Sequence, residues 1–128
     1  MEQVYDLKVL TLILGNEPGV LVYFSSESCS VCKVLRPKVK ELTEERFPAM
    51  RTLYVDIEKS PVLSGQQRIF SIPTILIFFE GRESHRFSRN IGIDQLVETM
   101  EKPYSLLFDP GDPGDPGDPG DLANPSSN

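Results

Sequence analysis

Cys29-Ser30-Val31-Cys32 contains the only two cysteines of this 128-residue chain. All of the redox chemistry that cysteine can carry out in this protein is therefore confined to one tetrapeptide. Two thiols at positions i and i+3 at the start of a helix can close a small disulfide and reopen it. Pro37 follows five positions after Cys32. A proline at that point is expected to kink the helix that the cysteines begin.

Hydrophobic periodicity predicts alternating helices and short strands along the chain. We expect helices over residues 3–15, 30–46, 62–70 and 93–100, and strands over 20–24, 50–57, 74–79 and 84–87. The first three strands alternate with helices, which favours parallel pairing, whereas the tight turn at 80–82 makes the last pair an antiparallel hairpin. The predicted fold class is α/β, with a central mixed sheet of about four strands, flanking helices and an extra N-terminal helix.

The charge of the chain is unevenly distributed. Its formal net charge is −6, but the segment 109–128 contains five Asp and neither Lys nor Arg, which leaves 14 acidic and 13 basic residues in the first 108. We therefore expect no basic surface for nucleic acid. The Asp-Pro-Gly triplets of 109–120 cannot bury apolar surface. The sequence thus predicts one domain over 1–108 and a disordered acidic tail over 109–128.

The N-terminal region does not resemble a secretory signal, because Glu2 and Asp6 stand where such a signal carries basic residues. No stretch approaches 18 uninterrupted apolar residues, so we expect no membrane span. These observations favour a cytoplasmic protein. In that reducing compartment a Cys-x-x-C pair is more often catalytic or metal-binding than structural.

A Cys-x-x-C pair is also half of a zinc site. Zinc takes four ligands, and His85 is the only other soft ligand in the chain. A metal site within one chain is therefore disfavoured, and we expect neither a metal nor a cofactor. Two chains that share a zinc ion or an iron–sulfur cluster through four cysteines stay open as an alternative.

The place of the pair at a helix start predicts different roles for the two thiols. Unpaired backbone N–H groups and the helix dipole stabilise a thiolate in the first turn and lower its pKa. We therefore expect Cys29 to attack a substrate disulfide. Cys32 is expected to resolve the mixed disulfide that forms.

Several segments of the chain together match the pattern of one known family. They are Val20–Phe24, Cys29-Ser30-Val31-Cys32-Lys33, Pro37, Tyr54-Val55-Asp56, Ser71-Ile72-Pro73-Thr74, Ile75–Phe79 and Gly81. On these residues the chain resembles the thioredoxin family, roughly over residues 18–102. The resemblance implies the thioredoxin fold, with elements in the order β-α-β-α-β-β-α after the extra N-terminal helix.

The same resemblance implies how substrate is bound. It implies a cis peptide bond between Ile72 and Pro73 that faces the cysteines, and an Ile72 backbone that pairs with an extended substrate segment. Pro73 would also keep metal ions away from the thiols, and Ser30 and Val31 would contact substrate. The implied partners are disulfide-containing proteins and an upstream thiol reductant such as a thioredoxin reductase. The expected assembly is a monomer.

The chain departs from the family pattern around the cysteines. Ser28 stands where the family has Trp, Ser30-Val31 where it has Gly-Pro, Tyr23 where it has a buried Asp, Thr52 where it has Lys, and Arg89 near the position of a Gly that flanks the substrate groove. The Asp and Lys normally help to deprotonate the resolving cysteine, so the usual proton relay is missing. Glu27, two positions before Cys29, could replace it through water.

The sequence supports two functional hypotheses. The first is a thiol–disulfide oxidoreductase that reduces protein disulfides through a Cys29/Cys32 dithiol–disulfide cycle. The second is a partner-binding or redox-regulatory module on the same fold, with weak general reductase activity. The departures at Tyr23, Ser28 and Thr52 motivate the second.

Overall fold

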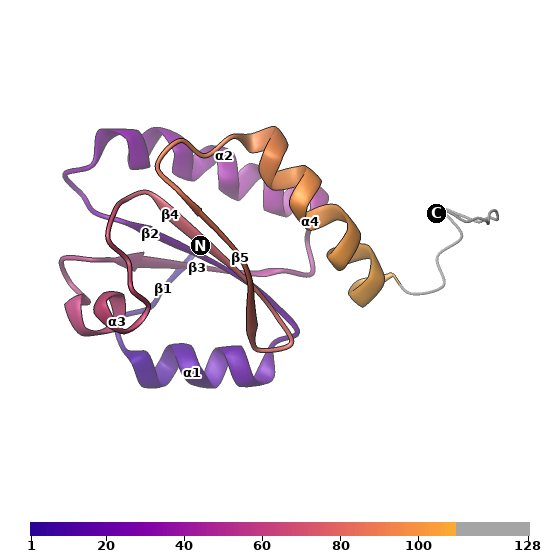
Figure 1. Ribbon diagram of the computed structural model, residues 1–128, viewed down its shortest axis with the longest axis horizontal. Helices are drawn as coiled ribbons and strands as arrows, with labels where there is room; N and C mark the ends of the chain where they lie inside the picture. The colour runs from indigo at the N-terminus through magenta and orange to yellow at the C-terminus, as the bar shows by residue number, and fades with distance from the viewer. Residues whose placement is uncertain (110–128) are drawn as a thin grey trace.

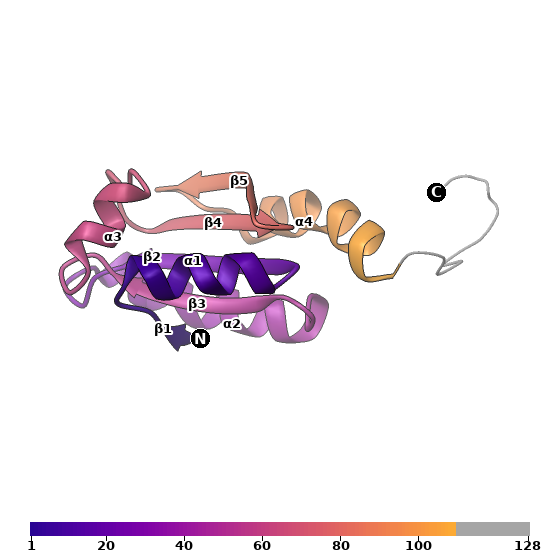
Figure 2. The ribbon, with the colours of Figure 1, turned by 90° about the horizontal axis from the view of Figure 1, so that it is seen from below.

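The computed structural model describes residues 1–109, which form a five-stranded sheet with helices on both faces (Figure 1). In chain order the elements are β1 (Glu2–Gln3), α1 (Leu7–Asn16), β2 (Gly19–Ser25), α2 (Ser30–Arg46), β3 (Arg51–Asp56), α3 (Pro61–Gln66), β4 (Thr74–Phe79), β5 (Arg82–Ser88) and α4 (Ile93–Phe108). The strand order is β1-β3-β2-β4-β5, so β1 and β5 form the two edges (Figure 2). β3 is parallel to β1 and β2, whereas β4 is antiparallel to β2 and β5. The predicted α/β class with a mixed sheet is confirmed. The predicted parallel pairing of the first three strands holds for β2 and β3 but is wrong for β4, because β4 lies beside β2 and runs antiparallel to it.

Strand β2 lies at the centre of the sheet, and all seven of its residues are buried. Its side chains alternate between the two faces. Val20, Val22 and Phe24 belong to the core cluster that α1 and α3 cover. Leu21 and Tyr23 belong to the cluster under α2 and α4, on the opposite face (Figure 1). Because both faces are covered, the strand is a continuous apolar run rather than an alternating one.

The prediction of a helix over residues 3–15 is wrong at its start. The Asp6 carboxylate accepts a hydrogen bond from the Lys8 N–H at 2.7 Å and so caps α1. Residues Glu2–Gln3 instead pair with β3 as the edge strand β1. The sheet therefore has five strands rather than about four. A two-residue strand is too short for its period to be distinguished from the first turn of an amphipathic helix.

Two other helices also differ in length from their prediction: α3 is shorter and α4 is longer. Pro103 lies inside α4, where sequence rules place a helix end. Tertiary contacts hold the additional turns, because the Tyr104 ring meets the Phe47 ring edge-on at 5.1 Å between centroids. The Tyr104 hydroxyl also accepts a hydrogen bond from the Ala49 N–H at 3.0 Å.

The predicted division into a domain over 1–108 and a disordered tail over 109–128 stays a prediction, because the tail lies outside the described residues apart from Asp109. Helix α4 ends at Phe108. Within residues 1–109, no helix has both the length and the hydrophobicity needed to cross a membrane.

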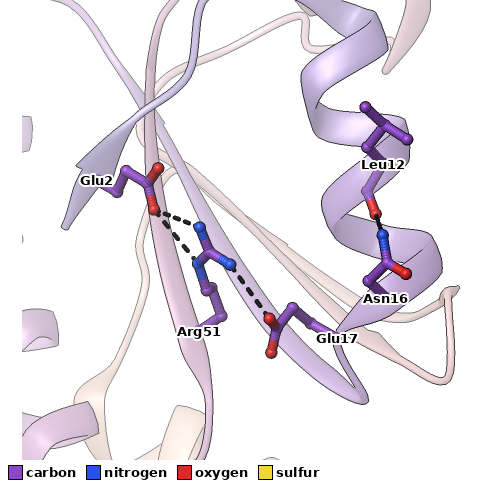
Figure 3. A network of polar contacts seen from close by, with 5 residues as sticks. All are labelled: Glu2, Leu12, Asn16, Glu17 and Arg51. Atoms are coloured by element: carbon purple, nitrogen blue, oxygen red, sulfur yellow. Dashed lines mark hydrogen bonds and ion pairs between the residues drawn. The ribbon is translucent and has the colours of Figure 1, made fainter.

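Arg51, the first residue of β3, joins three segments at one end of the sheet (Figure 3). Its guanidinium donates to Glu2 Oε1 at 2.7 and 3.3 Å and to Glu17 Oε2 at 3.1 Å. Hydrogen bonding to Glu2 is the main cause that raises the pKa of Arg51. The three side chains are partly exposed, so each pair contributes about 1 kcal/mol or less. Beside them, the Asn16 amide donates to the Leu12 carbonyl at 2.8 Å and closes the last turn of α1.

Helix α1 should depend on one buried face. Leu10 is 0% exposed, and Leu10→Ala should lower the free energy of unfolding by about 2–5 kcal/mol because it leaves a cavity. Leu12, 66% exposed on the same helix, is the matched control, and Leu12→Ala should change that free energy by less than about 0.5 kcal/mol. Urea unfolding followed by circular dichroism measures both values. Equal losses would contradict the packing of α1 on the sheet.

Candidate active site

The junction between β2 and α2 positions both cysteines. After β2 ends at Ser25, a short loop leads to Cys29, the N-cap residue of α2. The Cys29 N–H donates to the Ser26 carbonyl at 3.2 Å and holds the helix start against this loop. Cys29 and Cys32 form a disulfide, with their Cα atoms 5.3 Å apart. The fold thus brings the two cysteines together at the carboxyl end of the central strand.

The two sulfur atoms differ in access and in hydrogen bonding. Cys32 is 0% exposed, whereas Cys29 is partly exposed. The Cys32 N–H donates to Cys29 Sγ at 3.2 Å, in the manner of a helix N-cap. In the reduced protein this N–H is placed to stabilise a thiolate on Cys29. Cys29 is therefore the more exposed of the two cysteines and the one whose sulfur accepts a hydrogen bond.

Tyr23 lies beneath the first turn of α2, where the family pattern has a buried Asp. Its hydroxyl donates to the Cys32 carbonyl at 2.7 Å and is buried. Burial is the main cause that raises the pKa of Tyr23 to about 12, and the neighbouring Tyr54 adds to it. The hydroxyl is therefore neutral at ordinary pH. Tyr23 can anchor the helix start to the sheet, but it is not a base for the Cys32 thiol.

Two residues that the sequence did not predict as site residues, Tyr54 and Arg36, extend this arrangement. The register of β2 and β3 places Tyr54 opposite Tyr23, with the ring centroids 6.3 Å apart. The Arg36 guanidinium lies 3.7 Å from the centroid of the Tyr54 ring, a cation–π contact. Arg36 is on the second turn of α2, so the stack ties that helix to β3. The cross-strand pairing needed to foresee this is not readable from one sequence.

A small polar hollow of about 150 Å³ lies beside Cys32. Its lining comes from both sides of the β2–α2 junction and from the sheet edge: Gln3, Ser25, Ser26, Glu27, Cys32, Lys33, Arg36 and Tyr54. The exposed Glu27 carboxylate accepts a hydrogen bond from Lys59 Nζ at 3.2 Å, which is the main cause that raises the pKa of Lys59. Glu27, an exposed acid, and the buried Cys32 therefore line the same hollow.

The segment before β4 contains a cis peptide bond between Ile72 and Pro73. Ile72 packs on the same core cluster as Cys29. The Pro73 carbonyl accepts a hydrogen bond from the Arg89 N–H at 3.0 Å, which joins this segment to the end of β5. Within residues 1–109, neither the N–H nor the carbonyl of Ile72 makes a backbone hydrogen bond. Ile72 thus has free backbone groups.

An open groove of about 590 Å³ borders the cysteine turn. Its lining comes from the first turns of α2 and from the loop between β5 and α4: Ser30, Val31, Val34, Leu35, Lys38, Arg89, Asn90, Ile91 and Gly92. Val31 is 61% exposed. Ser30 and Val31 therefore line a groove, as expected of substrate contacts, whereas Ile72 and Pro73 are not among its lining residues.

His85 is the side chain that the sequence analysis weighed as a further metal ligand. His85 lies on β5, where its Nδ1 shares a hydrogen bond of 2.7 Å with the Ser84 hydroxyl. Within residues 1–109, His, Cys, Asp and Glu side chains form no group of three or more that could hold a metal ion. A metal shared between two chains stays an alternative that these residues do not test.

Comparisons with known proteins agree with this architecture. The family model for thioredoxin matches residues 3–102. A thioredoxin of Chlamydia trachomatis is 36% identical over 86 residues, which are 65% of this chain and 80% of that protein. The chloroplastic thioredoxin Y of rice is 29% identical over 90 residues, 70% of this chain. The chain spans about half the length of that relative, with 54% covered.

Solved structures give the same result for the fold. A thioredoxin of Fasciola hepatica superposes with a TM-score of 0.70 at 25% identity, covering 79% of this chain and 97% of that one. The oxidised mitochondrial thioredoxin 3 of Saccharomyces cerevisiae superposes with a TM-score of 0.71 at 16% identity, covering 79% and 93%. The α/β sheet, the disulfide at the start of α2 and the family match over residues 3–102 lead to one conclusion: the chain belongs to the thioredoxin family.

Proposed function

We propose that this protein is a thiol–disulfide oxidoreductase that reduces protein disulfides. One observation carries the proposal: the Cys29–Cys32 disulfide closes at the N-terminus of α2, with Cys29 partly exposed and accepting the Cys32 N–H at 3.2 Å. A structural disulfide needs neither an accessible sulfur nor a polarised one. A nucleophilic thiolate needs both.

The reaction proceeds by two exchanges of sulfur bonds. The Cys29 thiolate attacks one sulfur of a substrate disulfide, forms a mixed disulfide and releases the other substrate sulfur as a thiolate. The Cys32 thiol then loses its proton and attacks Cys29 Sγ, which closes the Cys29–Cys32 disulfide and releases the second substrate thiolate. Two electrons pass to the substrate. An upstream thiol reductant, such as a thioredoxin reductase, then returns two electrons to the pair.

Substrate binding is proposed at two places beside Cys29. Ser30 and Val31 line the groove next to the disulfide, which supports contact with the substrate around its cysteine. The unpaired backbone groups of Ile72 support pairing with an extended substrate segment, a form of strand addition. Pro73 follows with no N–H to donate, which keeps this segment from continuing the ladder of β4.

Glu27 is proposed to exchange the proton of Cys32. The neutral Tyr23 hydroxyl leaves the resolving thiol without a buried base. Glu27 and Cys32 line one hollow of about 150 Å³, which is large enough for bridging water. A carboxylate that reaches the thiol through water can accept its proton as Cys32 attacks.

The setting of this reaction is proposed to be the cytoplasm, with the protein acting as a monomer. Support comes from the partly exposed Cys29, which a reducing compartment keeps available as a thiol. The name of the rice relative places that protein in the chloroplast instead. The partners are disulfide-containing proteins and the upstream reductant.

A dedicated partner-binding or redox-regulatory module with weak general reductase activity is the second candidate. Tyr23 favours it, because a hydroxyl at this place holds the helix start without helping to deprotonate Cys32. Slow resolution would lengthen the life of a mixed disulfide with one partner. The two candidates therefore differ in rate and in the range of proteins captured.

General reductase activity is tested with insulin. The protein at micromolar concentration should accelerate insulin reduction by dithiothreitol, and Cys29→Ser should abolish the acceleration because the attacking sulfur is lost. Turbidity of the released insulin B chain is the measurement. Absence of acceleration by the unmodified protein would refute the general reductase.

The range of partners is tested by trapping. Cys32→Ser leaves Cys29 able to attack but removes the resolving thiol, so mixed disulfides should accumulate. A general reductase should capture many proteins from a cell extract, as counted by mass spectrometry of thiol-eluted material. Capture of a single protein would favour the regulatory module instead. The Cys29→Ser variant is the control for non-covalent retention.

The role of Glu27 is tested in the resolving step. Glu27→Gln should slow decay of a preformed mixed disulfide by roughly 100-fold, the low end of general-base effects, because the proton acceptor is removed. Glu58→Gln is the control, since Glu58 is an exposed acid that does not line the hollow. Stopped-flow release of a fluorescent peptide thiol measures the rate. Equal rates for the two variants would remove Glu27 from the relay.

A further inference from the structure

Arg89 has an unusual backbone conformation at the edge of the substrate groove. Its φ is +64°, in the left-handed region that favours glycine and is uncommon for a long side chain. Two hydrogen bonds fix this conformation: the Arg89 N–H donates to the Pro73 carbonyl at 3.0 Å, and the Ile91 N–H donates to the Arg89 carbonyl at 2.9 Å. The backbone of Arg89 is therefore held beside the cis peptide bond.

Arg89 lines two hollows. One is the groove of about 590 Å³ beside the cysteine turn, where Lys38 is the other cation. The second is a hollow of about 340 Å³ on the other side of Arg89, lined also by Arg68, Phe70, Ser71, Thr74, Arg86 and Ser88. No Asp or Glu lines either hollow. Arg89 thus stands between two recesses that hold positive charge and no negative charge.

The cations of this surface differ in whether the protein itself neutralises them. Arg86 is paired with the Glu83 carboxylate at 2.9 Å and also donates to the carbonyls of Gln67 and Arg68. Within residues 1–109, no carboxylate lies within 4.0 Å of the charged groups of Arg89 or Lys38. The charge of Arg89 is therefore available to a bound molecule.

The remaining feature of this surface is apolar. Phe70 is 90% exposed and lines the same hollow as Arg89, on the segment that leads to Ile72. A guanidinium beside an exposed aromatic ring and unpaired backbone groups suits an extended peptide with acidic residues. Charge complementarity thus identifies the occupant as an acidic disulfide-bearing segment of a substrate protein.

We propose that Arg89 is a specificity-determining residue that binds an Asp or Glu carboxylate near the substrate cysteine. The inference rests on the proposed thiol–disulfide activity and names its preferred substrates: disulfides in acidic segments. Bidentate hydrogen bonding by the guanidinium fixes the segment across the cis-proline loop. Lys38 also lines the groove and adds positive charge there. It strengthens the preference for acidic segments as a point charge, without the bidentate hydrogen bonding of an arginine.

Two synthetic disulfide peptides test the proposal. They have the same length and cysteine spacing and differ only in Asp or Asn beside the attacked cysteine. The reduced wild-type protein should show a kcat/KM about 5-fold higher for the Asp peptide at low salt, mostly through KM, as an exposed charge pair allows. The preference should disappear when ionic strength rises from about 0.01 M to about 0.5 M.

Three variants identify the residue responsible. Arg89→Gln should bring the ratio of the two kcat/KM values to about 1, and Arg89→Lys should retain about half of the preference as a point charge. Arg82→Gln changes the net charge equally but lies outside both hollows, so it should leave the ratio unchanged. A ratio lowered equally by Arg82→Gln would show a general field and overturn the assignment to Arg89.

The outcome also separates this inference from the function on which it rests. Reduction of both peptides by the wild-type protein at equal kcat/KM would overturn the specificity of Arg89 and leave the oxidoreductase standing. Failure to reduce either peptide would overturn the oxidoreductase and, with it, this inference. A preference that persists in Arg89→Gln would assign the selection to another group.

Discussion

The pairing of β2 on both of its edges is the constraint on which the rest of the structure depends. Its backbone is hydrogen-bonded to β3 on one side and to β4 on the other, and its seven side chains are all buried. A shift by one residue would exchange the two cores, so the register cannot slip. Since Cys29 follows shortly after this strand, the same constraint fixes where the disulfide lies. It also fixes Tyr23 on the side of α2.

The proton chemistry of the site follows from the face of the sheet to which each β2 side chain points. A residue at position 23 must point toward the first turn of α2, and an acid there would lie next to Cys32. The chain has a phenol instead, which donates to the Cys32 carbonyl and stays neutral. The interior therefore supplies alignment, and the base that we propose is Glu27, which lines the hollow beside Cys32. On this proposal, alignment and proton transfer are divided between Tyr23 and Glu27, whereas one buried acid could serve both.

Most of the fold could be predicted because its signals are local. Three elements are each indicated by a few neighbouring residues. The apolar run 20–24 indicates β2, the Cys-x-x-Cys spacing indicates the start of α2, and Ile-Pro-Thr indicates the start of β4. The edge strand Glu2–Gln3 could not be predicted, because two residues show no period and their partners in β3, Leu53 and Tyr54, are 51 positions further along the chain. The extent of α4 depends on Tyr104 meeting Phe47, another distant contact. Local propensity is overruled where such contacts add stability.

The candidate site was predictable in the same uneven way. Cys29 and Cys32 are only three positions apart, so their spacing, together with Pro37 and the Ile-Pro-Thr segment, indicated a redox pair. Arg36 and Tyr54 come from different elements, and their stacking depends on the register of two strands and on the rotation of α2. Arg89 could be noticed as an exception to the family pattern. Its left-handed φ and its bond to Pro73 became visible only in three dimensions.

The residues with a left-handed backbone conformation show where the fold itself requires that conformation. Within residues 1–109, three non-glycine residues have a positive φ: Arg68, Glu80 and Arg89. Glu80 is in the β4–β5 turn, where its N–H donates to the Pro18 carbonyl at 2.9 Å, and tight turns use this conformation. Arg68 and Arg89 line one hollow beside the cis bond.

A glycine would adopt the same backbone at either arginine without strain, whereas a side chain there costs of order 1 kcal/mol. Within residues 1–109, neither the Arg68 nor the Arg89 guanidinium forms an ion pair that would offset this cost. At Arg68 the fold itself uses this conformation, because the Arg68 N–H donates to the Gly65 carbonyl and the Ile69 N–H to the Ser64 carbonyl, a Schellman motif that ends α3. Arg89 ends no helix, and the carboxylate binding that we propose for it would account for a guanidinium at this position, because its contribution would come only when a partner is bound.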